Sequence, residues 1–260
     1  MCLILFSWKL HPDYPLIVAA NRDENYQRPT SPAHIWGDYP GILAGRDLEK
    51  GGTWMGISKT GRFAALTNYR NSAEVMKERS RGELPLQFLA GDETPHHFME
   101  TISSQGDEYP GYNLLAGTKE ELYYHSNVSN AVLKIEPGIH GLSNGLLDSE
   151  WPKVAWGKME LGRLLAKKKL NQEHLVEELF GILRHEERAP DHDLPYTGVP
   201  LEMERILSPL FIKTEGYGTR CSTILLYGKE HILFAERTYF QGEDFEDRFF
   251  SLPFTEAGRR

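Results

Sequence analysis

Residues 2–25, CLILFSWKLHPDYPLIVAANRDEN, decide the fold. Two apolar runs, at 2–8 and 15–20, flank the tetrad His11-Pro12-Asp13-Tyr14, whose residue types favour a turn. An antiparallel hairpin closed by this turn is centred near residue 12, so the numbers of paired residues sum to about 24. This register places Cys2 opposite Arg22 or, if a bulge intervenes, opposite an immediate neighbour.

The rest of the chain adds both strands and helices. Strand-like runs bounded by Gly, Asn or Pro are expected at 41–45, 53–58, 62–68, 112–116, 121–126, 131–135, 221–227 and 231–236. Gly61, in the turn at 59–61, is expected to have a positive φ. Residues 29–41 are interpreted as a connection. Helical spacing is expected around 84–89 and 98–102, from a cap at Asp148 or Ser149 to about 168, at 172–184, and around 201–207.

This order of elements predicts the fold class. Strands lead, helices occupy the middle, strands close the chain, and strands and helices do not alternate as in a doubly wound sheet. We therefore expect an α+β fold in which helices cover antiparallel sheets. No repeat or linker divides the chain, so residues 1–260 are expected to form one domain.

Composition limits the classes of function. The chain has 260 residues, 40% of them hydrophobic, which suits a globular protein. The net charge of −8, without a basic run, argues against nucleic acid as a partner. No apolar stretch reaches the roughly 18 residues of a membrane span, and no signal peptide is apparent, so we expect no membrane insertion and a cytoplasmic location. The oligomeric state is not indicated.

Cys2 is a candidate nucleophile because it directly follows the initiator methionine. Removal of Met1 would leave a cysteine with both a thiol and a free α-amine. The α-amine has a pKa of about 7.7–8.0 and the thiol one of about 8.5, so the amine can act as the base for the thiol. The alternative is a small hydrophobic residue buried on a strand, as free cysteines often are.

The tetrad Asn21-Arg22-Asp23-Glu24 supplies charge beside this cysteine in the predicted hairpin. An arginine there would lower the thiol pKa, and a carboxylate would orient the α-ammonium. Four polar residues at a strand end are by themselves more often solvent-exposed. Their adjacency to Cys2 favours a functional role for at least one of Arg22 and Asp23.

Several segments identify a family resemblance. Met1-Cys2 and Asn21-Arg22-Asp23-Glu24 resemble the NRDE family, whose eukaryotic members are called transport and Golgi organisation proteins. Four further segments match in family order across nearly the whole chain: GGTWMGI at 51–57, AALTNYR at 64–70, GLSN at 141–144 and YGTRCST at 217–223.

A more remote resemblance implies a fold and a mechanism. The pattern is similar to cysteine N-terminal nucleophile hydrolases of the bile-salt hydrolase and penicillin V acylase type. That similarity implies a four-layer αββα sandwich and makes Cys2 the nucleophile, with the remaining positions matching at Arg22, Asp23, Asn68, Asn144 and Arg220. In those hydrolases two residues separate the arginine from the aspartate, whereas here the two are adjacent. A shifted alignment would use Asn21 and Glu24 instead.

Asn68, Asn144 and Arg220 each have a structural reading beside the implied one. Asn144 lies on a turn from which its amide could donate to an oxyanion, which is worth about 2.7–4 kcal/mol, but turn asparagines are common. Asn68 ends an expected strand and is a second candidate donor. Arg220 could hold a carboxylate or the Cys2 thiolate, or be a solvated charge at a strand end. Cys221 is interpreted as structural.

The resulting hypothesis is a hydrolase or acyltransferase that acts on a linear amide and takes a small-molecule substrate. Cys2, Arg22, Asp23, Asn144 and Arg220 would be catalytic, and Asn21, Glu24 and Asn68 would bind substrate. No cofactor is expected, and no metal either, because the histidines show no metal-ligand spacing. The alternative is a non-catalytic carrier of haem or an acyl lipid, with Trp36, Trp54 and Met55 lining its pocket.

Overall fold

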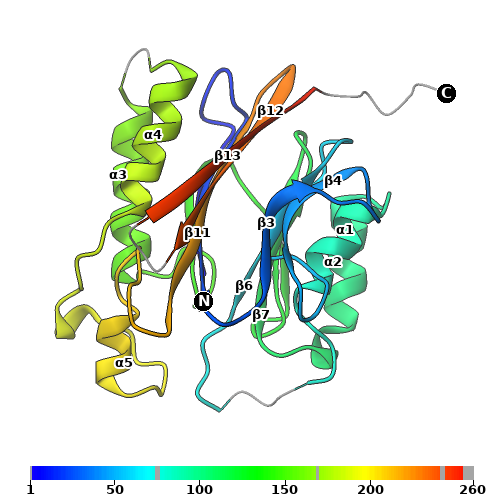
Figure 1. Ribbon diagram of the computed structural model, residues 1–260. Coiled ribbons are helices and arrows are strands. Elements are labelled where there is room, and N and C mark those ends of the chain that lie inside the picture. The colour runs from blue at the N-terminus through cyan, green and yellow to red at the C-terminus, as the bar shows by residue number, and fades with distance from the viewer. Residues whose placement is uncertain (1, 74–76, 168–169, 241–243, 254–260) are drawn as a thin grey trace.

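Two stacked antiparallel sheets form the centre of the computed structural model, which describes residues 2–73, 77–167, 170–240 and 244–253 (Figure 1). The first sheet has the strand order β10-β1-β2-β11-β12-β13. Its strands are β1 (Cys2–Trp8), β2 (Leu16–Asn25), β10 (Gly138–Leu142), β11 (Tyr217–Tyr227), β12 (His231–Phe240) and β13 (Asp244–Pro253).

The second sheet runs in sequence order from β3 to β9. Its strands are β3 (Thr30–Ile35), β4 (Ile42–Asp47), β5 (Met55–Ser58), β6 (Phe63–Asn68), β7 (Tyr112–Gly117), β8 (Leu122–Ser126) and β9 (Ala131–Lys134). Gly61, in the turn between β5 and β6, has a φ of +78°, which confirms the predicted positive φ.

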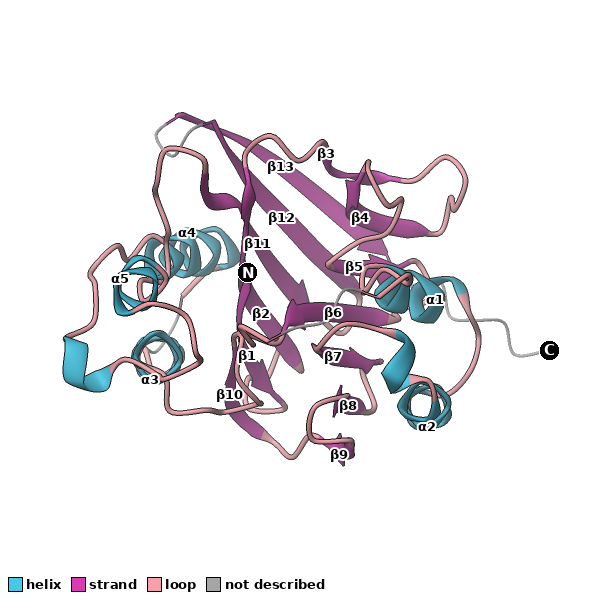
Figure 2. Cartoon of the chain, turned by 90° about the horizontal axis from the view of Figure 1, so that it is seen from below, coloured by secondary structure: helices cyan, strands magenta, loops and turns pink. Residues whose placement is uncertain are grey.

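Helices cover the outer faces of both sheets (Figure 2). The first sheet is covered by α3 (Pro152–Leu165) and α4 (Gln172–Leu183), and the second by α1 (Glu83–Ala90) and α2 (Pro95–Ser104). The short helix α5 (Leu201–Ile206) and two 3₁₀ turns, Gly106–Glu108 and Asp191–Asp193, lie in connections. The predicted α+β class and four-layer αββα order are therefore confirmed.

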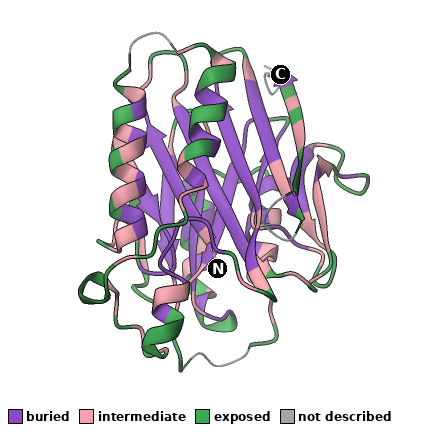
Figure 3. Ribbon diagram, turned by 60° about the vertical axis from the view of Figure 1, so that its left-hand side comes forward, coloured by how far each residue is buried: buried purple, intermediate pink, exposed green. Residues whose placement is uncertain are grey.

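Each strand of the first hairpin contributes to two cores, so its sequence is a continuous apolar run. Ile4 and Phe6 of β1 face the second sheet, and Leu3 and Leu5 face α3 and α4. Gly157 permits the close approach of α3, since a Cβ there would lie 2.6 Å from a methyl group of Leu5. Figure 3 shows this buried interior. No helix in the described ranges is both long and apolar enough to cross a membrane.

Several boundaries predicted from sequence were wrong. The strands β3, β10 and β13 were missed. β3 lies in a Pro-containing connection, and β13 contains three consecutive charged residues at 246–248 that interrupt any alternating pattern. β2 extends through the polar tetrad to Asn25. The helix α3 begins at Pro152 after Trp151, because the Asp148 carboxylate instead binds the Gly141 N–H and His140. That helix ends at Leu165, and residue 168 lies outside the described residues.

Candidate functional site

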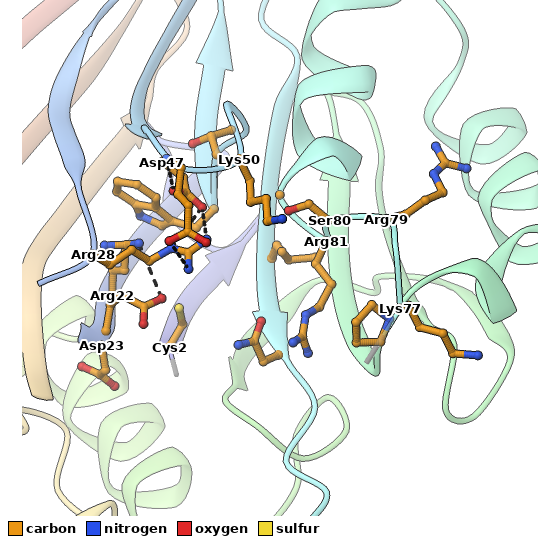
Figure 4. A pocket seen from close by; sticks show the side chains of 18 of the residues that line it. Cys2, Arg22, Asp23, Arg28, Asp47, Lys50, Lys77, Arg79, Ser80 and Arg81 are labelled. Atoms are coloured by element: carbon orange, nitrogen blue, oxygen red, sulfur yellow. Dashed lines mark hydrogen bonds and ion pairs between the residues drawn. The ribbon is translucent and has the colours of Figure 1, made fainter. Parts of the chain in front are cut away.

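A cleft of about 370 Å³ opens at the sheet ends, where β1 begins. Cys2 lies on one wall with Arg22 and Arg28, and residues that precede α1, among them Ser80 and Arg81, contribute the opposite wall (Figure 4). Cys2 is a partly exposed residue and lines this cleft. The other lining residues are Asp23, Glu24, Arg28, Asp47, Glu49, Lys50, Thr53, Trp54, Leu66, Asn68, 77–82 and Pro110.

The predicted hairpin register is confirmed. Cys2 pairs with Arg22 across β1 and β2, and Arg22 in turn pairs with Cys221 across β2 and β11. Alternate side chains along a strand share a face, and Ile4, Val18 and Leu225 belong to the core between the sheets. Cys2, Arg22 and Cys221 therefore form a row on the face that looks toward the second sheet.

Arg22 is the cation closest in register to the thiol. Its guanidinium lies 4.4 Å from the Trp54 ring centroid and donates to Thr30 Oγ1 at 3.3 Å. An ion pair with Glu24 measures 3.6 Å. Burial raises the pKa of the Cys2 thiol, the negative charge of Asp23 raises it further, and Arg22 opposes the rise. The thiol is therefore largely protonated at neutral pH and needs a base in order to attack.

Asp23 lies on the opposite face of β2, because it directly follows Arg22. Its Oδ1 accepts a hydrogen bond of 2.7 Å from Thr219 Oγ1, and its backbone carbonyl accepts one of 3.1 Å from Tyr217. Burial raises the pKa of the Asp23 carboxyl, and the positive charge of Lys153 opposes that rise. The adjacency of Arg22 and Asp23 thus brings opposite charges to the two faces of the strand that pairs with Cys2.

The other two residues of the tetrad have different surroundings. Asn21 is buried and does not line the cleft; its Nδ2 donates to the carbonyls of Leu183 and Leu210, both at 2.9 Å, and its Oδ1 accepts from Ser222. The substrate-binding role predicted for Asn21 therefore has no geometric support, because its amide is used to fasten α4 and the following segment to β2. Glu24 is partly exposed and lines the cleft.

The two asparagines lie together at the end of the second sheet. Asn144 is fully buried, and its Nδ2 donates to the Asn68 carbonyl at 2.8 Å. Its neighbour Ser143 donates to the Cys2 carbonyl at 3.0 Å. Asn68 lines the cleft, whereas Asn144 is not among the lining residues. Asn144 therefore positions Asn68, Ser143 positions the start of β1, and Asn68 is the asparagine of the two that lines the cleft with Cys2.

Arg220 does not line the cleft. It is the extra residue of a β-bulge in β11, since Thr219 pairs with Asp23 and Cys221 with Arg22. Its Nη1 donates to the carbonyls of Asn25 and Arg28, at 2.9 and 3.0 Å. The prediction that Arg220 holds the Cys2 thiolate is not supported, because the bulge directs this side chain to the turn after β2.

Sequence reasoning missed some lining residues and misplaced others. Trp54 lines the cleft as expected of a pocket wall, but Met55 and Trp36 are buried in the two cores. Lys50 and Arg81 contribute positive charge to the far wall. In the sequence, only the three basic residues of the mixed segment KERSR at 77–81 indicated that charge. Within the described residues no group of three or more His, Cys, Asp or Glu side chains is arranged to hold a metal ion.

Comparison with solved structures defines the class of fold. An N-acylethanolamine-hydrolyzing acid amidase ortholog from Caenorhabditis elegans superposes with a TM-score of 0.50 at 10% identity, over 86% of this chain and 92% of that chain. With its two antiparallel sheets between helix layers, the protein has an N-terminal nucleophile hydrolase-like fold. At this identity the likeness concerns the fold alone.

Sequence comparison then gives the family. Residues 1–241 match the family Transport and Golgi organisation 2, and the chain belongs to it. A Transport and Golgi organization protein 2 homolog from Homo sapiens is 36% identical over 256 residues, which cover 92% of this chain and 93% of the relative. The Drosophila melanogaster Transport and Golgi organization protein 2 is 28% identical, with 92% of both chains covered. The resemblance predicted from the sequence motifs is therefore confirmed.

Proposed function

We propose that this protein is an N-terminal cysteine amidohydrolase or acyltransferase that acts on a linear amide. The observation that carries the proposal is the placement of Cys2, a partly exposed residue at the first position of β1, at the wall of a cleft and in register with Arg22. The fold class and the family membership support it, because this fold can present the first residue of a strand at the sheet ends.

The proposed reaction begins after Met1 has been removed. The Cys2 sulfur attacks the amide carbonyl carbon, and the thiol proton passes to the α-amine. The C–N bond then breaks, the leaving nitrogen takes that proton, and a thioester remains on Cys2. Water hydrolyses the thioester to a carboxylic acid, so amide and water give acid and amine. An amine in place of water gives acyl transfer.

The remaining groups have roles consistent with their positions. Asn68 lines the cleft and offers an amide N–H to the developing oxyanion, while Asn144 holds the Asn68 backbone from behind. Arg22 stabilises the Cys2 thiolate, because its positive charge opposes the rise that burial causes in the Cys2 pKa. Asp23, on the other face of β2, is placed to orient the α-ammonium.

The test combines intact-mass spectrometry with turnover. The protein purified from its native host is expected to lack Met1 and to hydrolyse at least one member of a panel of acyl p-nitroanilides of increasing chain length. During turnover the Cys2 peptide should carry the acyl mass as a thioester. Cys2→Ala should abolish both signals, and the matched control Cys221→Ala should retain them.

Two results would overturn the proposal. One is quantitative retention of Met1 in the native host, because the α-amine base would then be absent. The other is undiminished turnover by Cys2→Ala. Saturable ligand binding without turnover, equal in the wild type and Cys2→Ala, would favour the carrier alternative.

A further inference from the structure

A cluster of buried charges lies behind Cys2, on the helix-covered face of the first sheet. Lys153, in the first turn of α3, is only 3% exposed. Arg70, which follows β6, and Glu204 of α5 form a buried ion pair and line the same small cavity as Lys153. Three positions far apart in the sequence thus bring two cations and a carboxylate together away from solvent.

One segment connects this cluster to Asp23. Lys153 Nζ donates to the Leu207 carbonyl at 3.1 Å, and the Leu210 carbonyl accepts from Asn21 Nδ2 at 2.9 Å. Further along, the Ile212 N–H donates to Thr219 Oγ1, which itself donates to Asp23. Residues 207–212 therefore place the Lys153 ammonium on the same face of the sheet as the Asp23 carboxylate.

Lys153 has capacity for a further electrostatic partner. Among the described residues, the Leu207 carbonyl is the one hydrogen-bond acceptor of an ammonium that carries three N–H groups. A buried ammonium needs a compensating negative charge. Burial lowers the pKa of Lys153 to about 8, and the positive charge of Arg70 lowers it further. Three negative groups oppose this fall, and Asp23 has a larger effect than Cys2 or Glu204.

We propose that Lys153 is a positioning residue for the Cys2 centre and keeps the Asp23 carboxylate ionised from the helix side of the sheet. This proposal adds a residue to the proposed function, and it rests on that function only because it takes Cys2 as the reacting group. The charged and titratable groups around the pair come from six parts of the chain: the N-terminal amine, Cys2 on β1, Arg22 on β2 with Tyr26 after it, Arg70 after β6, Glu204 on α5 and Tyr217 on β11.

Alkylation of Cys2 by iodoacetamide, followed against pH by peptide mass spectrometry, tests this role without a substrate. Without the ammonium, the pKa of the Asp23 carboxyl should rise further, so that a larger fraction of this carboxyl is protonated at pH 7. The loss of its negative charge, which raises the Cys2 pKa in the wild type, should then make alkylation at pH 7 faster. A simple loss of positive charge near the thiol would make it slower.

The design uses Lys153→Met, Asp23→Asn and the double variant. We expect both single variants to react several-fold faster than the wild type, and the double variant to react no faster than Asp23→Asn, since Lys153 acts through Asp23. Lys153→Arg should restore the wild-type profile. Lys158→Met, a partly exposed lysine on the same helix, is the matched control and should leave the profile unchanged.

Two outcomes would overturn the role of Lys153: a wild-type profile or slower alkylation in Lys153→Met, or independent effects of the two variants that multiply in the double variant. A lower melting temperature with an unchanged pH profile would show a merely structural lysine. If Lys153→Met does not fold, Lys153→Gln is measured against the same expectations. Failure of the proposed function is a separate observation, because it is the absence of amide turnover in the wild-type protein.

Discussion

The two cysteines differ in environment although both pair with the same residue. Cys2 and Cys221 flank Arg22 on one face of the first sheet. Cys2 lies at the open sheet end and lines the cleft, whereas Cys221 is 4% exposed and has the buried carboxyl of Glu236 beside it. Burial raises the pKa of both thiols, that of Cys221 well above its usual value, and Glu236 adds to the latter. Position along the strand, rather than the shared arginine, therefore separates a candidate nucleophile from a structural thiol.

The largest expected difference is in thiol reactivity. In the folded protein at pH 8, iodoacetamide should label Cys2 at least about 100-fold faster than Cys221, because Cys2 lines the cleft whereas Cys221 is buried and has a pKa well above the ordinary value. The Cys2 rate should rise with pH and reach half its maximum above the ordinary cysteine value of about 8.5, since burial favours the protonated form. Peptide mass spectrometry separates the two sites. Equal labelling rates of Cys2 and Cys221 in the native protein would show that their environments do not differ in the way described.

The next effect concerns the carboxyl that shields Cys221. Glu236 is 1% exposed, and its Oε1 accepts the Ala33 N–H at 2.7 Å, which joins β12 to β3 of the other sheet. Glu236→Ala should lower the free energy of unfolding by about 1–3 kcal/mol, because that N–H loses its partner. It should also speed labelling of Cys221, since a nearby negative charge is lost.

Urea denaturation measures the stability of Glu236→Ala. Glu246→Ala is the control, since Glu246 is an exposed residue of β13 whose ion pair with Arg248 lies at the surface. Its effect should be within about 0.5 kcal/mol. Equal stability of both variants would show that Glu236 does not join the two sheets.

A smaller effect is expected from removing the shared arginine. Arg22→Met keeps an unbranched side chain against Trp54 but loses the charge that lowers the Cys2 pKa. Alkylation of Cys2 at pH 7 should become several-fold slower, because the Cys2 pKa rises when the charge that opposes burial is lost. The control is Arg46→Met, because Arg46 lies 4.2 Å from the Trp36 ring outside the cleft. An unchanged Cys2 rate in Arg22→Met would mean that solvent screens this charge.

The sequence predicted the centre of the site because that centre is local. The turn at 11–14 alone determines that Cys2 meets Arg22, and the motifs identified the family. The charge behind the sheet was not predictable in this way. Lys153 and Asp23 come to the same face of the sheet because α3 packs on β1 and residues 207–212 are hydrogen-bonded both to Lys153 and to β2 and β11. Neither contact leaves a periodic signal in the sequence.

Arg220 shows a second reason for error. Strand alternation assigns a side chain to a face, but a bulge after Thr219 shifts the register by one residue and sends Arg220 to the turn at 25–28. The Pro-containing strand β3 was missed for a related reason, because its register with β4 also shifts between Ser31 and His34. Tertiary packing decides where the pairing of two strands becomes irregular, and neither the β-propensity of the residues nor their polar-apolar alternation contains that information.

The smallest expected effect tests whether the two thiols are independent. Cys221→Ala removes one buried atom from the first sheet and should lower the free energy of unfolding by about 1 kcal/mol, the magnitude for one buried methylene-sized group. Because Cys221 meets Arg22 from the side away from Cys2, the alkylation rate and pH profile of Cys2 should not change. A shifted Cys2 profile in Cys221→Ala would show that Arg22 moves when its second neighbour is lost. In that case the pKa values of the two cysteines would depend on each other through Arg22.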